Sequence, residues 1–148
     1  MEVKIFTDGA CSGNPGKGGW CAILTCNGSE KVIYDAEDNT TNNRMEMLAV
    51  INGLSALKTP CSVEVITDSK YVCDAFNAGW LENWRRNGWR TAGRKPVKNV
   101  ELWRTLDSLT KRHSVSFHWI KGHAGHAYNE RCDVIASSLA RGITPSEV

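Results

Sequence analysis

Four acidic side chains, widely separated along the chain, are candidates for one metal-binding cluster: Asp8, Glu46, Asp68 and Asp133. Each like-charge pair at contact distance costs on the order of 4 kcal/mol at an effective dielectric constant near 20, so such a cluster needs compensating cations. Two divalent cations would balance four carboxylates, and oxygen ligands favour Mg²⁺ or Mn²⁺ over zinc. Paired metals promote in-line phosphodiester hydrolysis by activating water and stabilising the departing 3′ oxygen. The chemistry predicted is therefore phosphodiester cleavage that leaves 5′-phosphate and 3′-hydroxyl ends.

Three of these acidic residues also have ordinary structural interpretations. Asp8 precedes Gly9, and an Asp-Gly pair after a strand commonly forms a turn. Glu46 lies in the expected first turn of a helix, off its apolar stripe, where an acidic residue interacts favourably with the helix dipole. Asp68 and Ser69 together are typical of a helix cap. The metal interpretation therefore depends on whether the fold brings the carboxylates together.

Histidines suggest a second group with a chemical role. His123 lies in the segment KGHAGH, and its ordinary pKa near 6.5 would let it give or take a proton at neutral pH. An exposed loop histidine without a function is the alternative. His123, His126 and Cys132 could instead form a zinc site, but a structural zinc site needs a fourth ligand and none is adjacent.

The segment from 80 to 98 differs in charge from the rest of the chain. It holds six basic residues against Glu82, a net charge of +5, which leaves −3 for the remainder. Three tryptophans, Trp80, Trp84 and Trp89, alternate with these cations. Basic side chains neutralise phosphates and indoles lie against sugars and bases, so the segment predicts nucleic-acid binding. A solvated basic face is the alternative, but tryptophans are costly on such a face.

Periodic apolar residues predict the elements that would hold these side chains. Alternation predicts strands over 3–8, 19–26, 31–36, 62–67 and 114–120, with Asn27-Gly28 as a hairpin turn between the second and third. Helical spacing predicts helices over 45–58, from Val100 to about 109, and over 129–141. Gly9, Gly13 and Gly16 should end the first strand after Asp8, with positive φ angles. If the first and fourth strands are neighbours, Asp8 and Asp68 lie at one sheet edge, where ligands bind in open α/β sheets.

Length and composition favour one domain over residues 1–148. The 148 residues are 41% hydrophobic, enough for a core without disulfide or metal support. Six cysteines show no pairing pattern, and we find neither a secretory signal nor an apolar run long enough to span a membrane. These features predict a cytoplasmic protein with reduced thiols, no membrane association and no obligate protein partner, most simply a monomer.

Six segments in order resemble the ribonuclease H family, specifically bacterial-type (type 1) ribonuclease H: TDGACSGNPG, TTNNRME, TDSKYV, NVELW, WIKGHAGH and NERCD. The resemblance spans nearly the whole chain. It implies an α/β fold with a five-stranded mixed sheet, three antiparallel strands followed by two parallel ones, and helices on both faces. It also implies an endonuclease that hydrolyses the RNA strand of RNA–DNA hybrids with two Mg²⁺ ions, Mn²⁺ being possible. Asp8, Glu46, Asp68 and Asp133 would be the catalytic metal ligands, and His123 a mobile proton carrier.

The same resemblance implies how the hybrid is held. Cys11, Asn14, Asn42 and Asn43 would line its minor groove, Thr41 would help to hold a DNA phosphate, and residues of the 80–98 segment would form a substrate-binding handle: Trp80, Trp84, Arg85, Arg86, Trp89 and Arg90. Asparagine side chains can pair with the 2′-hydroxyls that distinguish RNA from DNA. Turn and cap formation is the ordinary interpretation of these asparagines. A non-catalytic hybrid-binding module and another nuclease of the same fold are the remaining functional alternatives.

Overall fold

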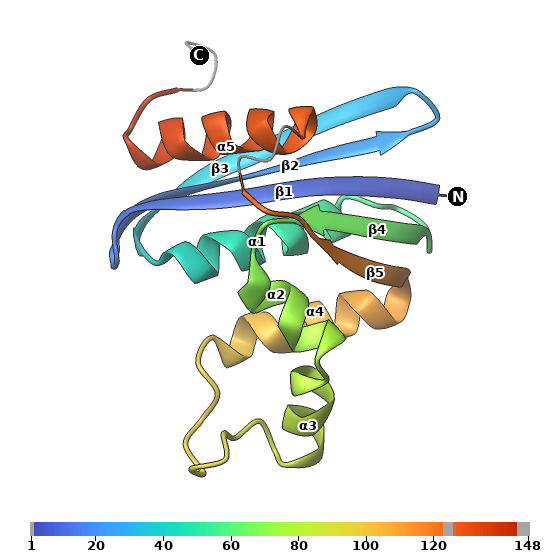
Figure 1. The fold of residues 1–148 in the computed structure, drawn as a ribbon, viewed down its shortest axis with the longest axis vertical. Helices are drawn as coiled ribbons and strands as arrows, with labels where there is room; N and C mark the ends of the chain where they lie inside the picture. The colour runs from blue at the N-terminus through green and yellow to red at the C-terminus, as the bar shows by residue number, and fades with distance from the viewer. Residues whose placement is uncertain (1, 123–125, 145–148) are drawn as a thin grey trace.

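The computed structural model describes residues 2–122 and 126–144. Its strands form one five-stranded sheet in the order β3-β2-β1-β4-β5 (Figure 1). The strands are β1 (Glu2–Gly13), β2 (Gly16–Cys26), β3 (Ser29–Thr40), β4 (Ser62–Thr67) and β5 (Ser114–Trp119). The helices are α1 (Asn42–Ser55), α2 (Lys70–Asn77), α3 (Trp80–Arg86), α4 (Val100–Arg112) and α5 (Ala127–Ala140).

The sheet is mixed, which confirms the predicted fold class. β1, β2 and β3 form an antiparallel meander, and β4 and β5 run parallel to β1. Asn27 and Gly28 join β2 to β3 with φ angles of 50° and 80°, as a tight hairpin turn requires. β1 is therefore the direct neighbour of β4, which was the condition for bringing Asp8 and Asp68 together.

The predicted end of the first strand is wrong. Pairing of β1 with β4 stops at Phe6 and Ile66, but β1 continues past Asp8 to Gly13 because β2 still supplies hydrogen-bond partners. The small residues of this stretch remain extended. Gly13, at φ 87°, takes the expected positive angle, whereas Gly9 and Gly16 do not and are paired in the β1–β2 ladder. Asp8 thus lies inside a long strand, just beyond the point where β4 separates from it.

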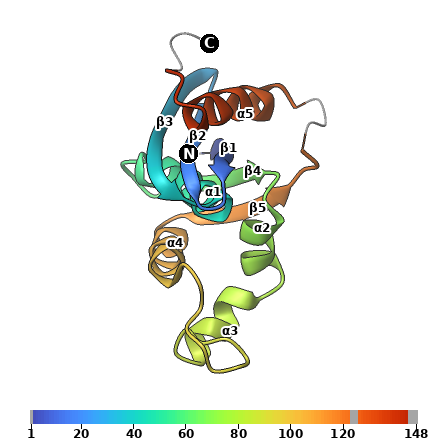
Figure 2. The same cartoon turned by 90° about the vertical axis from the view of Figure 1, so that its left-hand side faces the viewer.

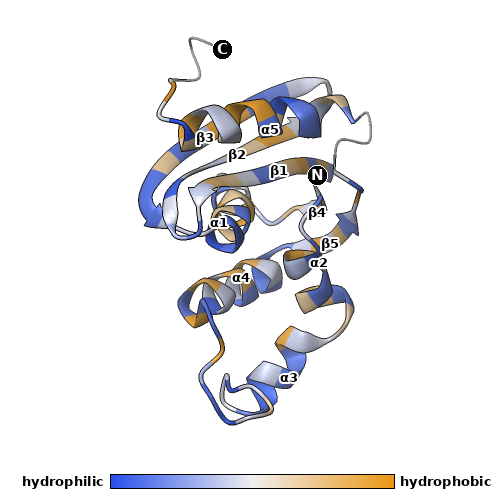
Figure 3. Cartoon of the chain, turned by 60° about the vertical axis from the view of Figure 1, so that its left-hand side comes forward, coloured by the Kyte–Doolittle hydropathy of each residue, from blue (hydrophilic) through white to orange (hydrophobic). Residues whose placement is uncertain are grey.

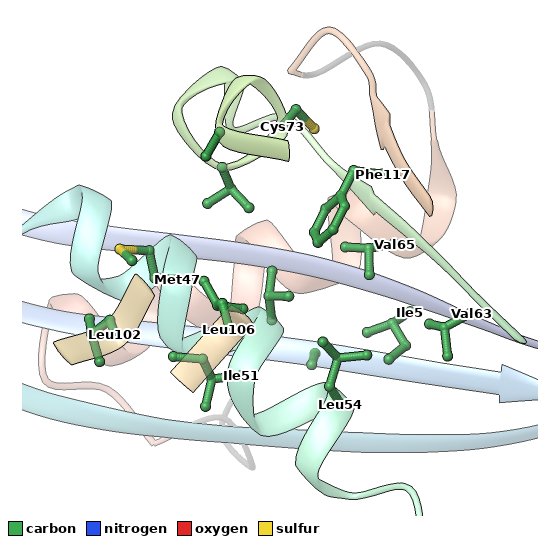
Figure 4. Packing of buried hydrophobic residues seen from close by; sticks show 14 of the residues in the cluster. Ile5, Met47, Ile51, Leu54, Val63, Val65, Cys73, Leu102, Leu106 and Phe117 are labelled. Carbon is green, nitrogen blue, oxygen red and sulfur yellow. The ribbon is translucent and has the colours of Figure 1, made fainter. Parts of the chain in front are cut away.

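Helices cover both faces of the sheet (Figure 2). α5 packs on β1 and β2 from one side, and α1 packs on the same strands from the other. The main core lies between the sheet and the layer that contains α1, α2 and α4, with Ile5, Val65, Leu54, Leu106 and Phe117 among its members (Figure 4). Burial of this apolar surface fixes both central strands, which carry the site, against rigid helices.

The segment 80–98 extends away from the sheet as α3 and a following loop (Figure 1), and Figure 3 shows it to be mostly hydrophilic. We call it the basic extension. Leu81 and Val97 are buried at its two ends, and the ring of Trp84 lies 5.4 Å from that of Trp103 in α4. The extension is therefore joined to the main core at both ends.

Two further features bear on the class of protein. In the described ranges no helix is both long and apolar enough to cross a membrane. All six cysteines are free thiols, as the absence of a pairing pattern predicts.

Candidate active site

Three of the four predicted carboxylates meet at one point. One carboxylate oxygen each from Asp8, Glu46 and Asp68 lies within 4.8 Å of the others. β1, α1 and the end of β4 supply these residues. The parallel pairing of β1 with β4 brings Asp8 and Asp68, 60 positions apart in sequence, close together, and α1 packs on β1. Such close approach of three acidic groups is the feature that ordinary turn or cap formation does not explain.

Glu46 reaches the cluster because α1 lies unusually close to β1. A Cβ atom on Gly9 would be 2.5 Å from the Glu46 backbone nitrogen and 2.5 Å from the Met45 carbonyl carbon, so only glycine allows this approach. The Glu46 side chain is buried, with 4% of its surface exposed, and its Oε2 atom has no hydrogen-bond partner among the residues that the structure describes. A buried, unpartnered carboxylate oxygen is costly without a cation or another polar ligand.

The prediction that Glu46 lies in the first turn, off the buried stripe, is wrong. α1 begins at Asn42, three residues before the predicted start, and Thr41 is the N-cap, its Oγ1 accepting a hydrogen bond from the Arg44 backbone nitrogen at 3.2 Å. Glu46 therefore falls in the second turn, where the sheet covers it. Its burial cannot be attributed to stabilisation of the helix N-terminus.

Asp68 follows directly after β4. The cap of α2 is Ser69, whose Oγ accepts a hydrogen bond from the Val72 backbone nitrogen at 3.2 Å. The capping interpretation thus applies to Ser69 and leaves the Asp68 carboxylate for the cluster.

Asp133, on α5, joins the site from the opposite side of the sheet. It lines a cavity of about 20 Å³ together with Asp8 and Asp68, which is enough space for about one water-sized particle. Its Oδ1 lies 3.5 Å from Ser137 Oγ, and Asp133 also raises the pKa of Asp8. Asp8 and Asp68 are therefore shared between the three-carboxylate group with Glu46 and the cavity with Asp133.

Burial and mutual repulsion make the charged forms of Asp8 and Glu46 unfavourable. Burial, followed by the charge of Asp68, raises the pKa of Asp8 from 3.8 to about 8. Burial and the charges of Asp8 and Asp68 also raise the pKa of Glu46 well above its ordinary value. A divalent cation would remove this penalty, and the donor set of carboxylate oxygens fits a hard ion such as Mg²⁺.

The histidine predictions are only partly addressed by the structure. His123 lies outside the described residues, whereas His126 immediately precedes α5 and lines the cavity. Cys132 is fully buried between α5 and the sheet, its Sγ donating to the Phe6 carbonyl at 3.3 Å. Contact with Cys21, together with burial, raises the pKa of the Cys132 thiol, so the thiolate that zinc requires is disfavoured. The rival zinc interpretation gains no support from this geometry.

The predicted minor-groove residues gather where the β1–β2 turn meets the start of α1. Asn14 Oδ1 accepts a hydrogen bond from the Asn42 backbone nitrogen at 3.1 Å, and Cys11 Sγ donates to the Thr40 carbonyl at 3.3 Å. Asn14, Asn42 and Asn43 are exposed, and Cys11 and Thr41 are partly buried. We call these five residues the polar rim; they lie in β1 and the turn after it, and at the N-cap and first turn of α1.

The six predicted residues of the basic extension separate into two groups. Trp84 and Trp89 pack against the main core, and Arg85 pairs with Asp107 of α4 at 2.9 Å. Trp80, Arg86 and Arg90 are exposed and line an open pocket of about 450 Å³, and one side of Trp84 also lines it. Arg86 also pairs with Glu82 at 2.9 Å on the surface. The first group thus attaches the extension, and the second is accessible to a ligand.

Two residues near the cluster are missed by the sequence interpretation. Asn129 lines the cavity and donates to the Ile66 carbonyl at 3.1 Å, while its Oδ1 atom is buried with no partner in the described part of the chain. The indole nitrogen of Trp119 donates to the Asp68 carbonyl at 2.9 Å. Trp119 could be identified from the sequence, because it lies near the end of the predicted strand over 114–120. In the structure this strand, β5, pairs with β4, which Asp68 follows.

Comparison with known proteins identifies the family. The family model for RNase H matches residues 1–141. The chain belongs to the ribonuclease H family. A curated relative named ribonuclease H, from Chelativorans sp. (strain BNC1), is 61% identical over 91% of this chain and 83% of its own. The resemblance drawn from the six sequence segments is thereby confirmed.

Solved ribonuclease H structures share the fold. LC9-RNase H1, a type 1 RNase H with the type 2 active-site motif, superimposes with a TM-score of 0.83 at 31% identity, over 97% of this chain and 74% of that one. LC11-RNase H1, solved in complex with an RNA/DNA hybrid, has a TM-score of 0.70 at 21% identity over 95% and 97% of the two chains. The second likeness concerns the fold alone.

Proposed function

We propose that this ribonuclease H family member is an endonuclease that hydrolyses the RNA strand of RNA–DNA hybrids and leaves 5′-phosphate and 3′-hydroxyl ends. The observation that carries the proposal is the close group of Asp8, Glu46 and Asp68, the first two of them buried, whose carboxylate oxygens fit divalent cations. A non-catalytic hybrid-binding module would have no need to maintain so costly a cluster. The 61% identical relative, named ribonuclease H, supports the choice of reaction.

Asp8, Glu46, Asp68 and Asp133 would hold two Mg²⁺ ions, or Mn²⁺ in their place. The sharing of Asp8 and Asp68 between the group with Glu46 and the cavity with Asp133 supports a pair of adjacent sites. Bound divalent ions supply Lewis-acid activation of water and stabilisation of the leaving 3′ oxygen. His123 would carry a proton at the leaving group, and His126, which follows it in the sequence, lines the cavity.

Recognition of the hybrid would use two surfaces. The polar rim of Cys11, Asn14, Thr41, Asn42 and Asn43 offers short donors and acceptors for 2′-hydroxyls and a DNA phosphate. The outward side chains Trp80, Arg86 and Arg90 would contact the backbone farther along the duplex. The solved complex of LC11-RNase H1 with an RNA/DNA hybrid shows that a protein of this fold binds such a duplex.

The setting we propose is a single catalytic domain over residues 1–148, with the basic extension as its handle, that acts as a monomer in the cytoplasm. The six free thiols support a reducing compartment. No further protein is needed to complete the cluster, since one chain supplies all four carboxylates.

Cleavage of matched duplexes tests the proposal. The purified protein is incubated with end-labelled RNA–DNA hybrid, double-stranded RNA and double-stranded DNA, each with Mg²⁺ and with EDTA. We expect Mg²⁺-dependent internal cuts in the RNA of the hybrid only, with 3′-hydroxyl ends that a polymerase can extend. Cleavage of DNA would favour another nuclease of this fold, and binding without cleavage would favour the non-catalytic alternative.

The division of the basic extension predicts different effects for neighbouring arginines. Replacing Arg86 and Arg90 with alanine should raise KM for the hybrid about 3- to 10-fold at 0.1 M salt and reduce the slope of log KM against log salt by about 1.5, with kcat nearly constant. Arg85→Ala should mainly lower Tm, by about 2–4 °C, because it removes the ion pair with Asp107. Steady-state kinetics at several salt concentrations and thermal melting distinguish the two classes. An unaltered salt slope in the double variant would contradict phosphate contact by the extension.

A further inference from the structure

The end of β5 contacts Asp68 at its backbone. Trp119 is the register partner of Thr67, the last residue of β4, and the Ile120 nitrogen donates to the Thr67 carbonyl at 2.9 Å. The Trp119 indole N–H then donates to the Asp68 carbonyl at 2.9 Å. This side-chain hydrogen bond extends the connection between the two strands by one residue, onto the residue that carries the carboxylate.

The same segment also lies close to the Asp68 side chain, and both line the cavity. A Cβ atom on Gly122 would lie 2.9 Å from Asp68 Oδ2, closer than side chains tolerate. Glycine at this position therefore leaves room for the carboxylate in its present place. Trp119 and Gly122 bracket Asp68, one at its carbonyl and the other at its carboxylate.

Packing in the hydrophobic core does not fix the position of the Trp119 side chain. The side chain is 43% exposed, among the most exposed large apolar residues of the described part of the chain. The Lys70 ammonium lies 5.6 Å from the centre of its ring, a favourable cation–π arrangement that restricts the indole. An exposed indole held by a cation and a directed hydrogen bond is suited to fixing its bond partner, Asp68.

We propose that Trp119 is a positioning residue that orients Asp68 for divalent-cation binding, with Gly122 leaving the space that this orientation needs. The inference rests on the proposed function, in which Asp68 is a metal ligand. Metal sites depend on outer groups that fix their ligands, and loss of such a group weakens binding without removing a ligand. Trp119 acts here on the main chain of Asp68, and Gly122 on the position of its carboxylate.

Trp119→Phe tests the indole hydrogen bond, because phenylalanine keeps an aromatic ring and removes the N–H. Calorimetric titration of the metal-free protein with Mg²⁺ should show about 2- to 10-fold weaker binding, the loss expected for one hydrogen bond. At limiting Mg²⁺, kcat should fall by a similar factor and recover at high Mg²⁺, while KM for the hybrid stays within about twofold.

Tyr34→Phe is the matched control, since Tyr34 on β3 is 44% exposed and also loses one polar hydrogen. It should bind Mg²⁺ like the unaltered protein.

Gly122→Ala tests the second contact and keeps the inference testable should Trp119→Phe fail to fold. The added methyl group should displace the Asp68 carboxylate and weaken Mg²⁺ binding about 10-fold or more. Wild-type Mg²⁺ affinity in either folded variant would overturn the positioning role it tests. Asp68→Asn separates the two proposals: if it weakens Mg²⁺ binding and Trp119→Phe does not, only the positioning role fails, whereas unchanged binding in Asp68→Asn rejects the proposed function itself.

Discussion

Asp8→Asn should abolish hybrid cleavage while making the metal-free protein more stable. Asp8 belongs both to the group with Glu46 and to the cavity with Asp133. Its loss should therefore disturb both cation sites and lower kcat by about a thousandfold or more, since metal ions contribute several kcal/mol to transition-state stabilisation. Cleavage of labelled hybrid at saturating Mg²⁺ measures the activity.

The stability effect of Asp8→Asn should depend on pH. Folding raises the pKa of Asp8 from 3.8 to about 8, so this carboxyl favours the folded state fully below about pH 4 and progressively less as pH rises to about 8. In EDTA, the stability of the unaltered protein should therefore fall over this range. Asparagine carries no titrating proton, and at pH 8 the variant should melt about 5–10 °C higher, a gain on the order of a few kcal/mol. Below about pH 4 the two proteins should differ little.

Asp38→Asn is the control for this experiment. Asp38 is 91% exposed and 3.7 Å from Lys17, so its replacement should alter neither activity nor the pH profile of Tm. Addition of Mg²⁺ at pH 8 should raise the Tm of the unaltered protein and of the control more than that of Asp8→Asn. Parallel pH profiles for Asp8→Asn and the unaltered protein would show that neither burial nor the charge of Asp68 raises the pKa of Asp8 in the folded state.

Gly9→Ala should damage the protein more than a single methyl group ordinarily does. The new Cβ would meet backbone atoms of Met45 and Glu46 at 2.5 Å, and neither can move without shifting α1 from the sheet. We expect a loss of about 3 kcal/mol or more in the free energy of unfolding, measured with urea in EDTA. Because Glu46 would move with the helix, Mg²⁺ affinity should also fall in whatever folded protein remains.

Gly93→Ala provides the matched substitution. Its nearest neighbour would be Thr91 Oγ1 at 3.8 Å, an ordinary van der Waals contact, so stability should stay within about 0.5 kcal/mol. Equal stability of Gly9→Ala and Gly93→Ala would mean that α1 does not need its close approach to β1.

The basic extension shows where residue type alone is an incomplete guide. Its charge and tryptophan content predict a nucleic-acid surface, but three of the six side chains assigned to substrate serve attachment in the structure: Trp84, Arg85 and Trp89. Trp103 and Asp107, both on α4, provide the partners for Trp84 and Arg85. Sequence spacing within α3 does not reveal which face α4 will cover, because that depends on packing between segments far apart in the chain.

Local sequence patterns identify the family and most of the secondary-structure elements. Alternating and helical apolar patterns, with Asn27-Gly28 as the hairpin turn, placed all five strands and three of the helices, because these signals arise from neighbouring residues. The motifs around Asp8, Glu46 and Asp68 indicated ribonuclease H in the same local way. Local patterns also misled where partners were distant: β1 continues past Asp8 because β2 supplies its hydrogen bonds.

The way in which the carboxylates meet, and the groups that hold them, depend on packing between segments that are distant in sequence. The 2.5 Å approach allowed by Gly9, the burial of Glu46 and the indole bond from Trp119 to Asp68 each join segments distant in sequence. All three have the same physical reason. Packing of apolar surfaces fixes the backbones, and the fixed backbones hold the acidic groups together; burial of the core offsets the free-energy cost of their repulsion. The sequence names the charged residues, but close packing decides which of them must share one site.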